Sequence, residues 1–361
     1  MEEMDKLSFV LVKFLRFSLT SSTDSSFDSF DSKTLVHLAY HQEVAALVYD
    51  AIDRLYRSGQ DIIEDKDAKL RLLKQALKQE QEYARNIQVI KKLSALFDSK
   101  GIAMYVLKGL STAQYYPKPQ LRYSCDMDCL LAAKCENGFE SRFDEGNKLI
   151  ESQGIRVTDD YYKHSEFRVS GLYVENHKFC CSIKRGKRTK ALEIYLQSLL
   201  NAGPHKDEKS GLYFPPLMFQ AIFLIEHANS HFLYEKINLK HICDWAMFRR
   251  ANTDLLDWNE FRIQCERFGL LNFVLAMDSL ADVIIGDKDY SDLDVWEKRI
   301  FDDSMQIVTY VESKMVRRFR KAFGILGASW KFRHFGHSSM LRELFTAFFA
   351  YLFEDNPQLT E

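Results

Sequence analysis

The sequence predicts a helix-rich α+β protein, in which a small α/β domain is flanked by helices that precede it and helices that follow it in the chain. Gly (15) and Pro (6) are sparse in the 361 residues while Phe (27) is plentiful, which favours helices around a substantial core. Apolar residues recur at helical spacing before residue 99 and again after residue 214. Between these regions, short β-rich runs alternate with short helical segments, the pattern of a compact α/β unit.

The elements follow from local patterns in order along the chain. The Ser/Asp-rich stretch 20–33 is typical of a loop or helix cap, and Gly101 suits the left-handed end of the long amphipathic helix before it. The predicted elements are helices over 34–56 and 66–98, a strand over 102–107, a short helix opened by Gly109, a strand bearing Asp126 and Asp128, a helix ending at Gly154, a hairpin turning at Gly171, a β-like run at 191–197, and helices from 214 onward. We expect three regions, with boundaries at 1–84, 85–205 and 206–361.

Bulk properties exclude several classes of protein. A net charge of −2 gives no general attraction to nucleic acid, so the short basic clusters at 184–190 and 317–321 are expected to be solvated. No long uncharged apolar segment predicts a membrane span, and Lys13 and Arg16 interrupt the apolar N-terminus, unlike a signal peptide. Seven cysteines without a pairing framework read as reduced thiols, and the expected location is cytoplasmic.

Two carboxylates carry the strongest chemical signal. Asp126 and Asp128 lie one residue apart in an apolar run, and alternate residues of a strand share a face. Met127 should therefore face the opposite side. Paired hard oxygen ligands suit Mg²⁺, or Mn²⁺, together with phosphate oxygens. An alternative interpretation is a strand-end pair that caps nearby backbone amides.

The surrounding motif resembles the uncharacterised nucleotidyltransferase family of bacteria, within the polymerase-beta-like superfamily. The residues that carry the resemblance are Leu107, Lys108, Gly109, Tyr116, Pro117, Arg122, Asp126, Asp128 and Leu130. It implies a mixed sheet whose three carboxylates hold Mg²⁺ and a nucleoside triphosphate. The third would come from a segment like Val-Glu-x-His, which Val174–His177 matches, so Glu175 is the candidate, with His177 as an auxiliary. Glu193 is the competitor.

The resemblance also implies a phosphate-binding segment. Many superfamily members carry Gly-Ser here, but Leu110 follows Gly109, so Ser111 is the substitute candidate. Gly109 permits close approach of a phosphate to the backbone. Lys108 and Arg122 are candidates to bind phosphate. Their structural alternatives are ion pairs, Lys108 with an aspartate and Arg122 within its loop.

A downstream helix supplies further candidates. His227 and His231 share a helix face and could bind Zn²⁺, but Ala228 stands where a metalloprotease signature needs Glu. The segment Leu239, Lys240, Asp244, Trp245 resembles a family motif that normally has Arg at the second position. We expect Lys240 to bind nucleotide and to pair with Asp244. Alternatively, this helix carries a buried polar network between two domains.

The expected function is Mg²⁺-dependent transfer of a nucleoside monophosphate from a triphosphate to an unknown small-molecule or macromolecular acceptor. Asp126, Asp128 and Glu175 would hold the metals, and Glu175 would help to deprotonate the acceptor. The first alternative is an inactive nucleotide-binding or partner-binding module on the same fold, because the usual serine is missing. The second is a helical scaffold, and a hydrolase built on His227 and His231 is more distant.

Overall fold

The computed structural model describes residues 2–20, 22, 26–27, 29–134, 138–306, 328–336, 340–342 and 345. The basic cluster at 317–321 therefore lies outside the described residues, as do residues 21, 23–25 and 28 of the Ser/Asp-rich stretch. Asp31, at the end of that stretch, accepts a hydrogen bond from the amide of Thr34 and so caps the helix that follows.

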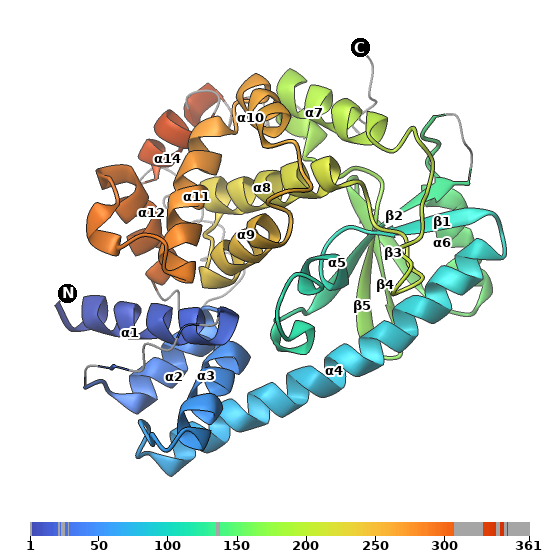
Figure 1. Cartoon of the computed structure of the whole chain (residues 1–361). Coiled ribbons are helices and arrows are strands. Elements are labelled where there is room, and N and C mark those ends of the chain that lie inside the picture. The colour runs from blue at the N-terminus through green and yellow to red at the C-terminus, as the bar shows by residue number, and fades with distance from the viewer. Residues whose placement is uncertain are drawn as a thin grey trace.

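The sheet is flanked by helices that precede it and helices that follow it in the chain, which confirms the predicted fold class (Figure 1). The N-terminal helices are α1 (Glu2–Leu19), α2 (Ser32–His41), α3 (Ala45–Arg57) and α4 (Lys66–Asp98). The C-terminal helices are α8 (Leu217–Tyr234), α9 (Leu239–Ala251), α10 (Trp258–Arg267), α11 (Leu271–Ile285), the 3₁₀ turn η3 (Tyr290–Asp292), α12 (Val295–Met305) and α14 (Ser329–Phe335). Among the described helices, we find none with the length and apolar character needed to cross a membrane.

The central region contains one five-stranded mixed sheet in the order β1-β2-β5-β4-β3. Strand β2 pairs antiparallel with β1 and parallel with β5, so β2 and β5 run side by side in the middle. The elements of this central region are β1 (Ile102–Val106), α5 (Leu110–Ala113), the 3₁₀ turn η1 (Pro119–Leu121), β2 (Asp126–Ala133), α6 (Phe143–Ser152), β3 (Val157–Tyr161), β4 (His164–Val169), β5 (Leu172–His177), the 3₁₀ turn η2 (Ile183–Arg185) and α7 (Lys187–Ser198).

The two faces of the sheet have different partners. Met127 and Val174 belong to an apolar cluster that includes Ile90 of α4 and Ile150 of α6. Because side chains alternate along a strand, Asp126 and Asp128 project from the other face, as the sequence predicted. On that other face, Leu130 joins the large core that the helices form. The alternation therefore places the acidic side chains between the sheet and the C-terminal helices.

Two local predictions were wrong, one strand was missed and one helix was confirmed to the residue. The helix expected over 34–56 is two helices, α2 and α3, because the positive φ of 56° at Glu43 interrupts it. The run 191–197 is helical, within α7, because Leu192, Glu193 and Leu196 are buried at helical spacing. Strand β3 was not predicted. The long helix α4 spans the predicted 66–98, and Gly101 has the expected positive φ of 72°. The three regional boundaries stay a prediction.

Candidate active site

The acidic cluster forms where the parallel strands β2 and β5 lie side by side. Asp128 is opposite Glu175 in the register, and Asp126 is opposite Tyr173. Carboxylate oxygens of Asp128 and Glu175 and a ring nitrogen of His177 all lie within 4.8 Å of one another. The exposed side-chain fractions are 27% for Asp126, 19% for Glu175 and 2% for Asp128. The cluster thus runs from a buried carboxylate outward to a more accessible one.

Lys108 lies immediately after β1 and joins the two aspartates. Its Nζ atom is 3.2 Å from Asp128 Oδ2 and 4.0 Å from Asp126 Oδ2. Burial alone would lower the pKa of Lys108, but the charges of Asp128, Asp126 and Glu175 outweigh burial and raise it. Lys108 therefore carries its positive charge at neutral pH. The structure thus contains the ion pair of Lys108 with the aspartates, which was the structural alternative to phosphate binding.

His177 connects the two more buried carboxylates. Its Nε2 lies 2.9 Å from Asp128 Oδ1 and 3.4 Å from Glu175 Oε2, while its Nδ1 lies 3.1 Å from the carbonyl oxygen of Phe179. Both ring nitrogens face acceptors, an arrangement that favours the protonated ring, which donates from both nitrogens. Burial opposes this charge, but the hydrogen bonds to Asp128 and Glu175 outweigh it and raise the pKa of His177.

The same contacts lower the pKa values of the carboxylates. Burial would raise the pKa of Asp128, but the Lys108 charge and the His177 hydrogen bond hold it well below its usual range. Burial would likewise raise the pKa of Glu175, but the hydrogen bond from His177, together with the charges of His164 and His177, outweighs burial and lowers it. His164, on β4, adds a second imidazole 3.8 Å from Glu175. Asp128 and Glu175 are therefore ionised at neutral pH.

Gly109 allows the turn that brings Lys108 to the carboxylates. Its φ is 74°, and a Cβ atom there would lie 3.2 Å from Ser124 Oγ and 3.3 Å from the Asp126 carbonyl oxygen. The hydroxyl of Ser111, the predicted substitute, is buried and donates to the Leu107 carbonyl. Ser124 was not predicted, yet its hydroxyl lies beside Gly109 and donates to the carbonyl of Asp126. A contact between residues 15 positions apart leaves no local trace in the sequence.

Arg122 forms a buried bidentate ion pair with Asp244 of α9. Its Nε and Nη2 atoms each donate to one carboxylate oxygen at 2.7 Å, and its Nη1 lies 3.3 Å from the Gly109 carbonyl. Tyr116 donates to the same carboxylate at 2.6 Å. Arg122 thus ties the loop before β2 to the C-terminal helices. Its donors face protein acceptors, which fits the structural alternative of Arg122 better than direct phosphate binding.

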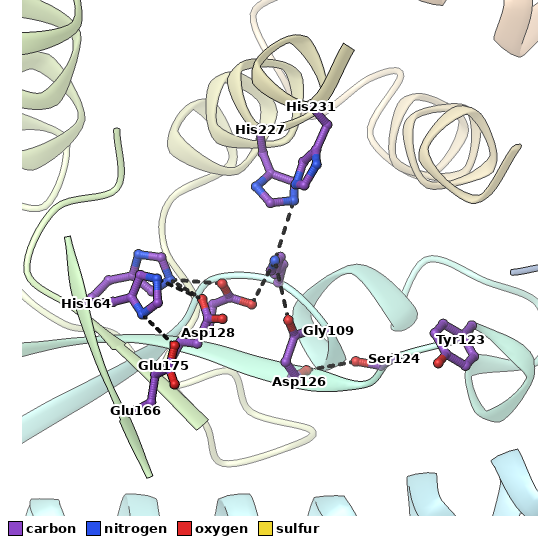
Figure 2. A network of polar contacts seen from close by, with 12 residues as sticks. Gly109, Tyr123, Ser124, Asp126, Asp128, His164, Glu166, Glu175, His227 and His231 are labelled. Atoms are coloured by element: carbon purple, nitrogen blue, oxygen red, sulfur yellow. Dashed lines mark hydrogen bonds and ion pairs between the residues drawn. The ribbon is translucent and has the colours of Figure 1, made fainter. Parts of the chain in front are cut away.

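Helices α8 and α9 lie over the acidic cluster, and a hollow that is partly open to solvent lies between them and the cluster. We call this space the central hollow. From below it is lined by Lys108, Gly109, Arg122, Ser124 and Asp126, and from above by His227, Lys240 and His241. Figure 2 shows His227 and His231 on the helix that faces Asp126 and Asp128.

Lys240 lies on the α9 side of the central hollow. Its Nζ is 2.6 Å from Glu43 Oε2, so the predicted pairing with Asp244 is wrong. The reason is that Asp244 points to Arg122 instead. His227 Nε2 lies 3.4 Å from Lys108 Nζ, which connects the upper and lower sides of the hollow. His241 also lines the hollow and was not predicted.

The competitor for the third carboxylate lies elsewhere. Glu193 is on α7, has no exposed surface, and accepts hydrogen bonds from the Cys181 amide and the Gln197 side chain. Glu175, in contrast, lies beside Asp128. The described structure therefore brings Asp128, Glu175, His177, Lys108 and Asp126 together and leaves Glu193 outside.

The comparisons with known proteins agree with the motif and the fold. The family model for uncharacterised nucleotidyltransferases matches residues 28–286, which is more than half of the chain. No curated protein and no solved structure gave a significant match. The matched range contains all of β1 to β5 and the helices α8 and α9 that bound the central hollow. The chain therefore belongs to the uncharacterised nucleotidyltransferase family.

Proposed function

We propose that this protein is a Mg²⁺-dependent nucleotidyltransferase that uses the acidic face of β2 and β5. The observation that supports this most directly is the convergence of Asp128 and Glu175 across the parallel strand pair, with Asp126 at the rim of the central hollow. The family membership implies a nucleoside triphosphate as substrate. The acceptor of the nucleoside monophosphate is a hydroxyl or phosphate group of a small molecule or a macromolecule.

The residues present fit a hard divalent cation. The donors are carboxylate oxygens, and Asp128 Oδ2 is buried without a hydrogen-bond partner in the described structure, with Lys108 nearby at 3.2 Å. Asp126, Asp128 and Glu175 would hold the ion, with phosphate oxygens completing its shell. When bound, Mg²⁺, or Mn²⁺, would neutralise charge that develops on the triphosphate. Lys108 would then leave the aspartates, which places its ammonium beside the phosphates.

The other residues of the central hollow have distinct proposed roles. Gly109 permits close approach of a phosphate, and Lys108 and Lys240 supply positive charge from opposite sides. Arg122 acts through its ion pair with Asp244, as a positioning residue for the Gly109 turn. Because the pKa of Glu175 is lowered, it is a weak proton acceptor, and its role is to bind the metal rather than to act as general base.

The reaction is an in-line displacement at the α-phosphorus. The acceptor oxygen forms the new bond to phosphorus, the bond to the bridging oxygen of pyrophosphate breaks, and the acceptor proton passes to solvent. The enclosing helices α8 and α9 would restrict water, which favours the acceptor over hydrolysis.

Asp126→Asn and Asp128→Asn test the proposal. Each should reduce pyrophosphate release from Mg²⁺ and nucleoside triphosphate by at least a hundredfold, because a neutral amide binds the cation poorly. The control is Asp144→Asn, at an exposed position of α6, which should be as active as wild type. Calorimetric titration with Mg-ATP measures binding separately. If a variant that carries both substitutions still bound Mg-ATP with wild-type affinity, the assigned site would be excluded.

One observation favours a second candidate, a nucleotide-binding module without turnover. The usual serine is replaced by Leu110, and the Ser111 hydroxyl is committed to the Leu107 carbonyl. This candidate predicts Mg-ATP binding that depends on Asp128, with no pyrophosphate release in the presence of any tested acceptor. Ser124, whose hydroxyl lies beside Gly109, is the replacement that an active enzyme would need. Ser124→Ala should then lower turnover and leave the fold intact.

A further inference from the structure

A cluster of three histidines lies above the acidic site and consists of His227 and His231 on α8 and His241 on α9. Each histidine offers one ring nitrogen, and these three nitrogens lie within 4.8 Å of one another. The ring centroids are 4.5 Å apart for His227 and His231, 5.5 Å for His231 and His241, and 6.2 Å for His227 and His241. The set converges on one point from two helices.

This geometry is close to that of a tetrahedral metal centre. Zn²⁺ binds imidazole nitrogens at roughly 2.0–2.1 Å, which places neighbouring nitrogens about 3.3 Å apart. Side-chain rotations that move the nitrogens by about 1 Å would therefore suffice. The two histidines of α8 are four residues apart and share one helix face, so the backbone already sets their spacing.

Neighbouring side chains fix the orientation of two rings. His241 Nδ1 lies 2.7 Å from Asn238 Oδ1, in the cap that begins α9. His231 Nδ1 lies 3.2 Å from Glu235 Oε2. In both rings the Nδ1 atom is engaged and Nε2 is left for another partner. A second nitrogen held by a carboxylate or amide oxygen is the arrangement that orients histidines in metal sites.

The surroundings of His227 and His241 disfavour the charged form of these two rings. Burial, followed by the charge of Lys108, holds the pKa of His227 well below its usual value. Burial and the charge of Lys240 do the same for His241. Both imidazoles are therefore neutral at physiological pH, and neutral imidazole is the form that binds a metal.

We propose that His227, His231 and His241 bind one Zn²⁺ ion. His227 and His241 line the central hollow, so the fourth coordination position faces that space, where water or a substrate oxygen completes the shell. The site is distinct from the acidic cluster in its chemistry, because nitrogen ligands favour Zn²⁺ over Mg²⁺. It stands independently of the proposed transferase activity.

Lys108 modulates this site. Its ammonium lies 3.4 Å from His227 Nε2 and 3.2 Å from Asp128 Oδ2, so it contacts both clusters. A Zn²⁺ ion on the histidines would repel this ammonium toward the aspartates, to which it is already paired. Removing the ammonium should therefore strengthen Zn²⁺ binding.

Calorimetric titration of the metal-free full-length protein with Zn²⁺, and the visible spectrum with Co²⁺ as a substitute, test the site. Wild type should bind one equivalent with a tetrahedral Co²⁺ spectrum. His231→Gln and His241→Gln should each weaken the affinity at least tenfold, and Lys108→Met should strengthen it. The side chain of His231 is 37% exposed, so its replacement should not disturb folding.

The matched control is His41→Gln. His37 and His41 also lie four residues apart on one helix, α2, with ring centroids 4.4 Å apart, but they belong to no three-residue cluster in the described structure. His41→Gln should leave the high-affinity equivalent unchanged. Asp128→Asn should retain this equivalent, with an affinity altered only through its partner Lys108, which separates this site from the Mg²⁺ site. Undiminished binding in His241→Gln, or loss of binding in Asp128→Asn alone, would overturn the proposal.

Discussion

Arg122 and Asp244 show how single residues join the sheet to the helices. Their side chains are only 5% and 8% exposed, and they form two hydrogen bonds of 2.7 Å. Removing one partner leaves an uncompensated buried charge, which typically costs about 3–5 kcal/mol. We expect Arg122→Met and Asp244→Leu each to lower the free energy of unfolding by this amount in urea titrations. The double variant should recover much of the loss.

The pair Arg57 and Asp53 provides the control for this cycle. Their closest atoms are 2.8 Å apart, but the Arg57 side chain is 77% exposed, so the interaction is screened by solvent. Arg57→Met should cost less than about 0.5 kcal/mol. Equal losses at the buried and the exposed pair would show that Arg122 and Asp244 do not stabilise the fold through their charges.

The carboxylates also show which part of a site can be predicted from sequence. Asp126 and Asp128 are one residue apart, so the two-residue period of a strand is enough to place them on one face. Ser124 and His241 were missed because their contacts depend on how separate elements pack. His241 follows His231 by ten positions across a turn, and no periodic pattern connects them. Local geometry is encoded in short spacings, whereas convergence of elements is not.

At the scale of elements, α7 differs most from its sequence pattern. Residues 191–197 include Ile194 and Tyr195, which favour strands, yet the segment is helical because Leu192, Glu193 and Leu196 share a buried face. Burial of that face overrides local propensity. By contrast, α4 was predicted to its ends because an amphipathic stripe persists over many turns and a glycine follows it. Strand β3 is a short polar edge strand with an irregular register, so it gave no apolar alternation to detect.

The buried Glu193 of α7 gives this element a pH dependence. Burial raises the pKa of Glu193 above the usual 4.5, against the opposing effect of the Cys181 amide. Between pH 4.5 and the raised pKa of Glu193, the folded protein binds the proton of this side chain more tightly than the unfolded chain does. The contribution of Glu193 to stability is therefore lost as the pH rises from about 4.5 through its folded pKa.

Glu193→Gln removes this titration and keeps an oxygen that can accept the Cys181 amide. We expect the free energy of unfolding of the variant, minus that of wild type, to be larger at pH 8 than at pH 5. Urea titrations of both proteins at the two pH values measure this difference. A difference that does not change with pH would show that Glu193 has the same pKa in the folded and the unfolded chain.

At the scale of the whole molecule, the N-terminal and C-terminal helices share one core. Leu15 of α1, Leu47 of α3 and Phe273 of α11 belong to the same buried cluster, which also reaches Leu130 of the sheet. Helix α1 packs against both α3 and α11. The central hollow depends on this arrangement, since Lys240 of α9 pairs with Glu43, which lies between α2 and α3. Helices distant in sequence therefore position the upper side of the site together.

A shared core predicts that these helices unfold together. All four tryptophans, Trp245, Trp258, Trp296 and Trp330, follow residue 205, so tryptophan fluorescence reports on the C-terminal helices. Phe14 of α1 is fully buried, and Phe14→Ala should cost about 3–5 kcal/mol. We expect it to lower the urea midpoint measured by fluorescence as much as the midpoint measured by circular dichroism. Leu255→Ala, at a side chain 70% exposed, is the control and should leave both midpoints unchanged. A fluorescence midpoint that stays at the wild-type value in Phe14→Ala would mean that the N-terminal helices unfold as a separate unit, despite the continuous core.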